Sequence, residues 1–140
     1  KLFAAVAGVF DDEVLSLFEL ELSQRVLPEA KRIAHILSEV PRAIIWERVD
    51  WIGRVLEAAA GRDVDLYRAV TSALYSAVIS GVRSGTPGQP YPQDLEQRDR
   101  ARAIADGLPR GSATERFYRN LQHSAEADIA RKIEHDEELL

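Results

Sequence analysis

Three histidines, each placed shortly before a glutamate, are the residues whose types and spacing best suit proton transfer or metal binding. His35 lies four residues before Glu39, and His123 lies three residues before Glu126. His135 has the same three-residue spacing to a following glutamate. Bundles that bind two metal ions use the opposite order, Glu-x-x-His, with further acids on two other helices. The three pairs therefore indicate solvated, charged helix faces, and we expect no metal ion.

The composition excludes several other kinds of catalysis. The 140 residues include no cysteine, which rules out disulfides, zinc–thiolate sites and thiol nucleophiles. The sequence contains no Gly-x-Ser-x-Gly elbow, and no strands are predicted that could build one. We therefore predict no catalytic residue and no cofactor.

A loop from Arg83 to Pro92 is the most distinctive feature of the chain. It contains three of the six prolines and two of the eight glycines, so neither a helix nor a strand can continue through it. Its polar groups form a candidate interaction or ligand loop: Arg83, Ser84, Thr86, Gln89 and Tyr91. The alternative is a connector whose prolines and Tyr91 pack onto the neighbouring helix. The segment resembles a phosphate-binding loop only weakly, because it lacks the Gly-Lys-Ser/Thr ending.

Two tryptophans lie on one strongly amphipathic segment. Trp46 and Trp51 are five residues apart, so on a helix they project to different sides. Both are candidate interface aromatics, because a partly exposed tryptophan often anchors an interface. Burial in the core of a helical bundle is the alternative for either ring.

Arginines gather between Arg98 and Arg119, which taken alone would suit phosphate contacts. Acidic residues are interleaved with them, and the chain as a whole has a net charge of −5. No aromatic residues alternate with the arginines to stack on bases. The pattern predicts a surface of mixed charge, and we expect no nucleic-acid partner.

Apolar residues recur at three- and four-residue steps along most of the chain, which indicates helices separated by proline and glycine. The expected helices span residues 12–27, 28–40, 44–59, 66–82, 92–106 and 112–133. The short link at Gly61 makes its two flanking helices antiparallel neighbours. We predict an all-α protein: an irregular bundle of about five to seven helices built from αα-hairpins. A short helical-repeat solenoid is the alternative.

Local signals predict how several helices begin. Asp11 and the acids after it suit the start of the first helix, and Asp63 or Asp65 suits the helix after Gly61. Ser112 and Glu115 form a capping box in which each side chain bonds the other residue's backbone N–H. The helix over 92–106 is weakly apolar, and its expected core anchors are Leu95, Ile104 and Leu108.

The first ten residues, Lys1–Phe10, combine a basic residue with an apolar run. We interpret the run as a buried helix; the remnant of a secretory signal is the alternative. It is too short to cross a bilayer, so no membrane partner is expected. The chain contains no methionine, which indicates a fragment of a longer protein. We expect residues 1–140 to form a single helical domain in the cytoplasm.

These observations favour a non-catalytic helical module for protein interaction or oligomerisation, with a protein partner or a second copy of the chain. The alternative is a small-molecule-binding sensor domain of a regulator. Its cavity would use aromatic walls and a polar anchor: Tyr67, Tyr75, Tyr91 and Arg83. A metal- or carboxylate-dependent enzyme is the least favoured of the three functions.

Overall fold

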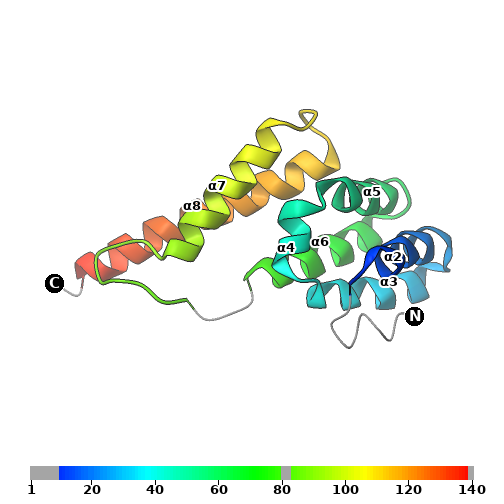
Figure 1. Ribbon diagram of the computed structural model, residues 1–140, viewed down its shortest axis with the longest axis horizontal. Coiled ribbons are helices and arrows are strands. Elements are labelled where there is room, and N and C mark those ends of the chain that lie inside the picture. The colour runs from blue at the N-terminus through cyan, green and yellow to red at the C-terminus, as the bar shows by residue number, and fades with distance from the viewer. Residues whose placement is uncertain (1–9, 80–82, 139–140) are drawn as a thin grey trace. The chain divides into compact units, whose positions relative to one another are not determined.

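A computed structural model describes residues 10–79 and 83–138, and these residues form seven α-helices, one 3-10 helix and no strand (Figure 1). The prediction of an all-α fold is confirmed. Apart from Phe10, the buried helix expected over Lys1–Phe10 lies outside the described residues. The elements are α2 (Asp12–Gln24), α3 (Leu27–His35), the 3-10 helix η1 (Ile36–Glu39), α4 (Arg42–Glu47), α5 (Val49–Ala60), α6 (Val64–Ile79), α7 (Pro92–Asp106) and α8 (Ala113–Glu138).

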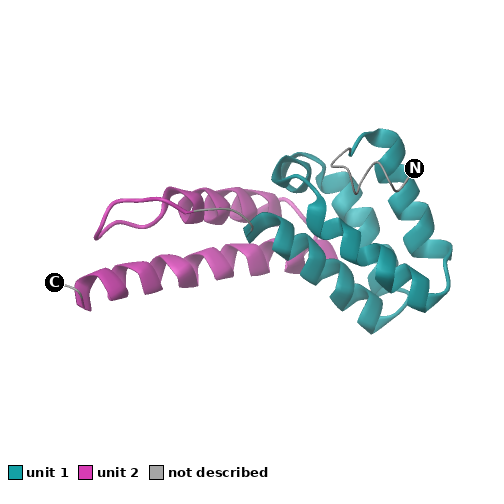
Figure 2. Ribbon diagram, turned by 90° about the horizontal axis from the view of Figure 1, so that it is seen from below, with its two compact units in different colours: residues 1–80 teal, residues 81–140 magenta. Residues whose placement is uncertain are grey.

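The helices separate into two compact units, residues 1–80 and residues 81–140 (Figure 2). Unit 1 contains α2 to α6, and unit 2 contains the proline-rich loop, α7 and α8. The expectation of a single domain remains a prediction. None of the helices in the described part of the chain is long and apolar enough to cross a membrane.

Unit 1 is a bundle built from two helical hairpins. In the first, α2 packs against α3, and in the second, α5 packs against α6; α2 also contacts α5, and α3 contacts α6. The four helices therefore surround one core, which is the bundle predicted from the periodic apolar residues. Its largest fully buried side chains include those of Trp51, Phe18, Leu15, Leu56 and Leu74.

Trp51 holds the centre of this core. Its ring is fully buried, and the ring of Phe18 meets it edge-on at a centroid distance of 6.5 Å. The indole N–H donates to the carbonyl oxygen of Leu15 at 2.7 Å. A buried indole N–H without a partner would be destabilising, so this bond lets α5 bury the whole ring against α2.

The caps expected in unit 1 are present. Asp11 accepts a hydrogen bond from the backbone N–H of Val14 at 2.9 Å, and Asp63 accepts one from Leu66 at 3.0 Å. Each carboxylate satisfies a donor that the first turn of a helix leaves free. Pro28 lies in the first turn of α3, where its missing N–H leaves no helical hydrogen bond unmade.

The helix expected over residues 44–59 is wrong in one respect, because the chain breaks it at Arg48. This residue has φ −111° and ψ 52°, outside the helical region, and separates α4 from α5. The Arg48 guanidinium forms an ion pair with Asp12 of α2 at 2.6 Å and another with Asp50 at 3.4 Å. No glycine or proline marks the break, so hydrophobic spacing alone predicted one continuous helix.

Arg62 joins the two hairpins of unit 1. It lies in the turn between α5 and α6, and its guanidinium donates to the carbonyl oxygen of Leu22 at 2.7 Å and to that of Arg25. Both carbonyls belong to the C-terminal end of α2, where the helix leaves acceptors without partners. One side chain therefore closes the end of one helix from the turn of another hairpin.

Unit 2 is an antiparallel hairpin of α7 and α8 (Figure 2). The expected anchors of α7 were incorrect, since Leu95, Ile104 and Leu108 are only half-buried. The residues that α7 buries are instead small or polar: Asp94, Gln97, Ala101 and Ala105. The Gln97 side-chain amide donates to the carbonyl oxygen of Leu121 on α8 at 2.8 Å. Alanine side chains let the two helices approach closely, which leaves less room for leucine.

The capping box at the start of α8 is formed in part. The Ser112 hydroxyl accepts from the backbone N–H of Glu115 at 3.1 Å, as predicted. The Glu115 carboxylate accepts from the N–H of Gly111 at 3.2 Å, one residue earlier than expected. Gly111 has φ +83°, a conformation that favours glycine, and this turn brings its N–H toward the carboxylate. Along α8, Phe117, Leu121 and Ala125 are buried, as the four-residue spacing predicted.

Candidate interaction surfaces

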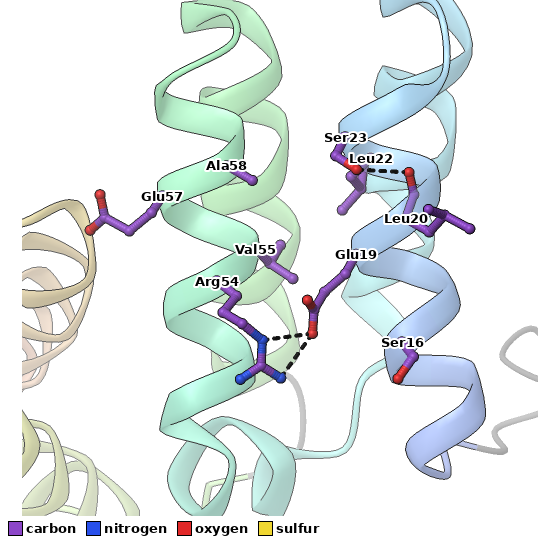
Figure 3. Close-up of a pocket in the computed structure, with 9 residues that line it drawn as sticks. All are labelled: Ser16, Glu19, Leu20, Leu22, Ser23, Arg54, Val55, Glu57 and Ala58. Atoms are coloured by element: carbon purple, nitrogen blue, oxygen red, sulfur yellow. Dashed lines mark hydrogen bonds and ion pairs between the residues drawn. The ribbon is translucent and has the colours of Figure 1, made fainter.

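A groove on unit 1 lies between α2 and α5 and has a volume of about 570 Å³ (Figure 3). Leu22 and Val55 form its buried apolar floor, and Ala58 extends that floor to the surface. The groove is lined by Ser16, Glu19, Leu20, Leu22, Ser23, Arg54, Val55, Glu57 and Ala58. Small side chains on both facing helices explain why the surface is hollowed at this point.

A charged pair spans the groove from one helix to the other. Arg54 of α5 contacts the carboxylate of Glu19 on α2 at 2.9 Å (Figure 3). It also contacts Asp50 at 3.4 Å. The hydrogen bond to Glu19 is the main cause that raises the pKa of Arg54 above its usual value. The Arg54 side chain is still 52% exposed, so its outer N–H groups can reach a further carboxylate.

Leu20 stands exposed beside this groove. Although it belongs to the amphipathic segment of α2, 48% of its surface is accessible. Six apolar positions between 14 and 22 cover too wide an arc of a helix to face one core. Val14, Leu15, Phe18 and Leu22 take the inner face, and Leu20 is left outside.

The two tryptophans have different environments. Trp51 is fully buried in the core of unit 1, as described above, so its ring offers no exposed contact surface. Trp46 on α4 is half-buried. Of the two candidate interface aromatics, Trp46 alone keeps part of its ring accessible.

The root of the proline-rich loop is held by arginine. Arg83 forms ion pairs with Asp94 of α7 at 3.2 Å and with Asp128 of α8 at 3.3 Å. Asp94 is 1% exposed, and neither of its carboxylate oxygens accepts a hydrogen bond from the described residues. Burial raises the pKa of the Asp94 carboxyl, and Arg83 opposes that increase only in part.

The far end of the loop is held by a second carboxylate. The backbone N–H of Gly88 donates to Asp136 of α8 at 2.7 Å, and Lys132 forms an ion pair with the same carboxylate. The Lys132 ammonium lies 5.0 Å from the centre of the Tyr91 ring. The hydrogen bond from Lys132, followed by that from Gly88, lowers the pKa of Asp136. Gly88 has φ +82°, which glycine adopts without strain.

The five residues proposed as an interaction loop therefore differ in their surroundings. The side chain of Arg83 contacts Asp94 of α7, and the ring of Tyr91 lies beside Lys132 of α8. The other three residues, Ser84, Thr86 and Gln89, are exposed. The carbonyl oxygen of Thr86 accepts from the backbone N–H of Gln89 at 3.1 Å, which closes the turn. The contact between Tyr91 and Lys132 of α8 agrees with the connector hypothesis, and an interaction role for the exposed residues stays a prediction.

The residues proposed for a sensor cavity are divided between the two units. Tyr67 and Tyr75, proposed with Arg83 and Tyr91 as a sensor cavity, lie on α6 of unit 1. None of these four residues lines the groove between α2 and α5. His123 contacts Glu126 at 3.3 Å on the exposed surface of α8. Among the described residues, no cluster of three or more histidine, aspartate or glutamate side chains could hold a metal ion.

Several arginines of unit 2 are paired with acids. Arg98 contacts Asp99 at 2.9 Å and Arg100 contacts Glu96 at 3.0 Å. Arg119 contacts both Asp106 and Glu115 at 3.0 Å. These pairs make a surface of mixed charge, and the absence of a nucleic-acid partner stays a prediction.

Two features of these surfaces escaped sequence reasoning. No pattern in the sequence predicted that Asp94 is buried, because an aspartate in the first turn of a helix is usually explained by the helix dipole. Lys132 and Asp136 are spaced as an ordinary helical ion pair, and only folding brings Gly88 to them. No protein-family model, curated protein or solved structure matches this chain. The functional argument therefore depends on the geometry of these surfaces.

Proposed function

We propose that this chain is a non-catalytic helical module that pairs with a second copy of itself through the face formed by α2 and α5. The observation that supports the proposal is the exposed Leu20 beside an apolar groove on the same surface. A surface leucine at 48% exposure gains free energy when a partner removes it from water.

A two-fold dimer requires one patch to be complementary to itself, because each residue of the patch meets the same patch on the other copy. The face has both halves of such a contact. Leu20 is a projecting apolar group, and the hollow over Leu22, Val55 and Ala58 is an apolar receptor. We expect a two-fold axis through this face to bring each leucine to the hollow of the other copy.

The charges on this face are also suited to a second copy. Arg54 and the exposed Glu57 lie three residues apart on α5, and Asp50 lies four residues before Arg54. Positive and negative side chains are thus both present on the α5 side of the groove, so the arginine of each copy can contact an acidic residue of the other. A contact limited to the groove is small, and a stable dimer needs about 1,200–2,000 Å² in total. We therefore expect neighbouring parts of α2 and α5 to contribute and the dimer to be of micromolar affinity.

The test is sedimentation equilibrium of the purified chain over a concentration series, with Leu20→Glu as the disrupting variant. Val64→Glu is the matched control, because Val64 is 59% exposed on α6 and does not line the groove. We expect the wild-type chain and Val64→Glu to dimerise alike, and Leu20→Glu to remain monomeric. A wild-type chain that stays monomeric at about 100 µM, well above the expected dissociation constant, would refute self-association. Equal weakening by both variants would refute this face as the interface.

A further inference from the structure

The loop over residues 83–91 is attached to the α7–α8 hairpin at two places that differ in chemistry. At its root, Arg83 contacts Asp94 and Asp128, at 3.2 and 3.3 Å. At its far end, the N–H of Gly88 donates to Asp136, which also pairs with Lys132. The intervening residues are exposed, and among them the carbonyl oxygen of Thr86 lies 3.5 Å from the Lys132 ammonium, which belongs to the far attachment.

The root attachment contains an unusual group. Asp94 is a buried carboxylate, and none of the described residues donates a hydrogen bond to either of its oxygens. The contact with Arg83 is short enough for an ion pair, but it does not meet hydrogen-bond geometry. A charge taken from water is costly unless partners and hydrogen bonds compensate for it. Asp94 has a charged partner but no hydrogen bond, so its charged form is poorly stabilised.

We propose that the loop is an acid-released clasp, in which uptake of one proton by Asp94 loosens the root of the loop, leaving the hydrogen bond from Arg83 to Asp128 as its attachment, while the far end stays attached. The neutral carboxyl no longer attracts Arg83. Asp128 then remains as the second acid in contact with the guanidinium, and Asp128 also pairs with Arg131 on its exposed side. The root attachment therefore loses one of its two carboxylates.

The charges around Asp94 set the direction of this effect. Arg83 from the loop and Arg131 from α8 favour the charged carboxylate, whereas Asp128 and burial favour the neutral acid. Burial has the largest effect, so the pKa of Asp94 lies above that of an ordinary aspartate. The pKa of Asp136 is lowered by Lys132 and Gly88. On acidification Asp94 is therefore neutralised first, and Asp136 keeps its charge to a lower pH.

Loosening of the root has a consequence for the residues singled out in the sequence. Arg83 then keeps only its contact with Asp128, so the part of its guanidinium that faced Asp94 becomes able to contact an external anion or carboxylate. Ser84 and Thr86 lie next to it on the exposed loop. The hairpin itself need not open, because neutralising a buried acid removes a cost from the folded state. The clasp is thus a local change on a stable support.

A probe on the loop tests the proposal directly. The chain has no cysteine, so Ser84→Cys provides one labelling position for a spin label on an exposed residue next to Arg83. We expect the label's mobile fraction to rise as the pH is lowered from neutral toward the range in which an ordinary aspartate titrates, because burial raises the pKa of Asp94. Circular dichroism over the same range should show unchanged helix content.

Two variants separate the clasp from general loosening of the loop. Asp94→Asn in the labelled chain carries a permanently neutral side chain, so the label should already be mobile at neutral pH and insensitive to acid. Arg83→Gln should give the same result although Asp94 itself is retained, which keeps the test valid if Asp94→Asn does not fold. Asp136→Asn is the control, and it should leave the pH response of the label in place.

A several-fold rise in the mobile fraction on acidification, abolished by both Asp94→Asn and Arg83→Gln, would support the clasp. A label whose mobility is constant across the range would overturn it. A pH response that persists unchanged in either of the two variants would overturn it equally, because the titrating group would then lie elsewhere.

Discussion

Unit 1 and the α7 helix of unit 2 bury different kinds of side chain. Unit 1 packs large apolar groups, with Trp51 and Phe18 at its centre. The α7 helix of unit 2 contributes alanines together with buried Asp94 and Gln97. The first arrangement gains stability from apolar area removed from water. The second depends on close helix contact and on polar groups that must find partners. Unit 1 should therefore tolerate changes of pH, and unit 2 should respond to them.

The largest expected effect is the loss of the central ring of unit 1. Trp51→Ala removes a fully buried side chain, so we expect the free energy of unfolding to fall by about 3–5 kcal/mol. Urea unfolding followed by circular dichroism measures the loss. Trp51→Phe is the informative companion, because it keeps an aromatic ring but leaves the Leu15 carbonyl without the indole donor. A loss below about 1 kcal/mol for Trp51→Ala would contradict the assignment of this ring as the centre of the core.

The packing of unit 2 can be tested with the opposite change in size. Ala105→Leu adds bulk at a position that is 1% exposed, and overpacking should destabilise the chain by about 1–3 kcal/mol. Ala103→Leu on the same helix is the matched control, because Ala103 is exposed and both substitutions have similar helix propensity. Thermal unfolding compares the two variants. Equal stability of both would show that α7 and α8 do not need small residues between them.

Arg62 tests how the hairpins of unit 1 are joined. Arg62→Ala leaves the carbonyls of Leu22 and Arg25 without their side-chain donor, and we expect a loss of about 1–2 kcal/mol in urea unfolding. Arg68→Ala provides the control, since the Arg68 side chain is 74% exposed. If both substitutions lowered stability equally, the cap on α2 would contribute nothing specific.

The smallest effect concerns the pH dependence of unit 2. The folded-state pKa of Asp136 is lowered, so its contribution to stability is present above the unfolded-state pKa and is lost as the pH falls through the folded-state value. In acid titrations monitored by thermal unfolding, the wild-type chain should lose more stability than Asp136→Asn below about pH 4. Glu134→Gln, at an exposed position two residues earlier, should behave as the wild type does. Identical acid profiles for the wild type and Asp136→Asn would remove this residue from the clasp.

Helix positions were largely predictable, and the reason is local. The caps at Asp11, Asp63 and Ser112 use side chains that bond the backbone within three residues, so the sequence contains all the partners. The proline-rich loop was equally clear, because proline and glycine limit the backbone without help from the rest of the fold. Prediction failed where no proline or glycine marks a break in a helix. The break at Arg48, with its ion pair to Asp12, is the clearest example.

The surfaces were less predictable than the helices. Leu20 and Leu22 are both leucines in one amphipathic segment, yet one is 48% exposed and the other is buried. From the sequence, Asp94 is an ordinary acidic residue in the first turn of a helix, but it is buried in the folded hairpin. In each case the burial of the side chain depends on which residues of other helices lie opposite it. Spacing along the chain does not show which residues those are. The groove and the clasp therefore had no signal that a single sequence could supply.

The amino-acid order determined that this protein is all-α and fixed where most helices begin and end, because those outcomes follow from backbone restrictions and from hydrogen bonds between near neighbours. The tertiary structure decided which leucine remains in water, which aspartate is removed from it, and which carboxylates hold the loop. Burial and ion pairing depend on groups brought together from distant parts of the chain. Their energies are set by that assembly and by the water it excludes.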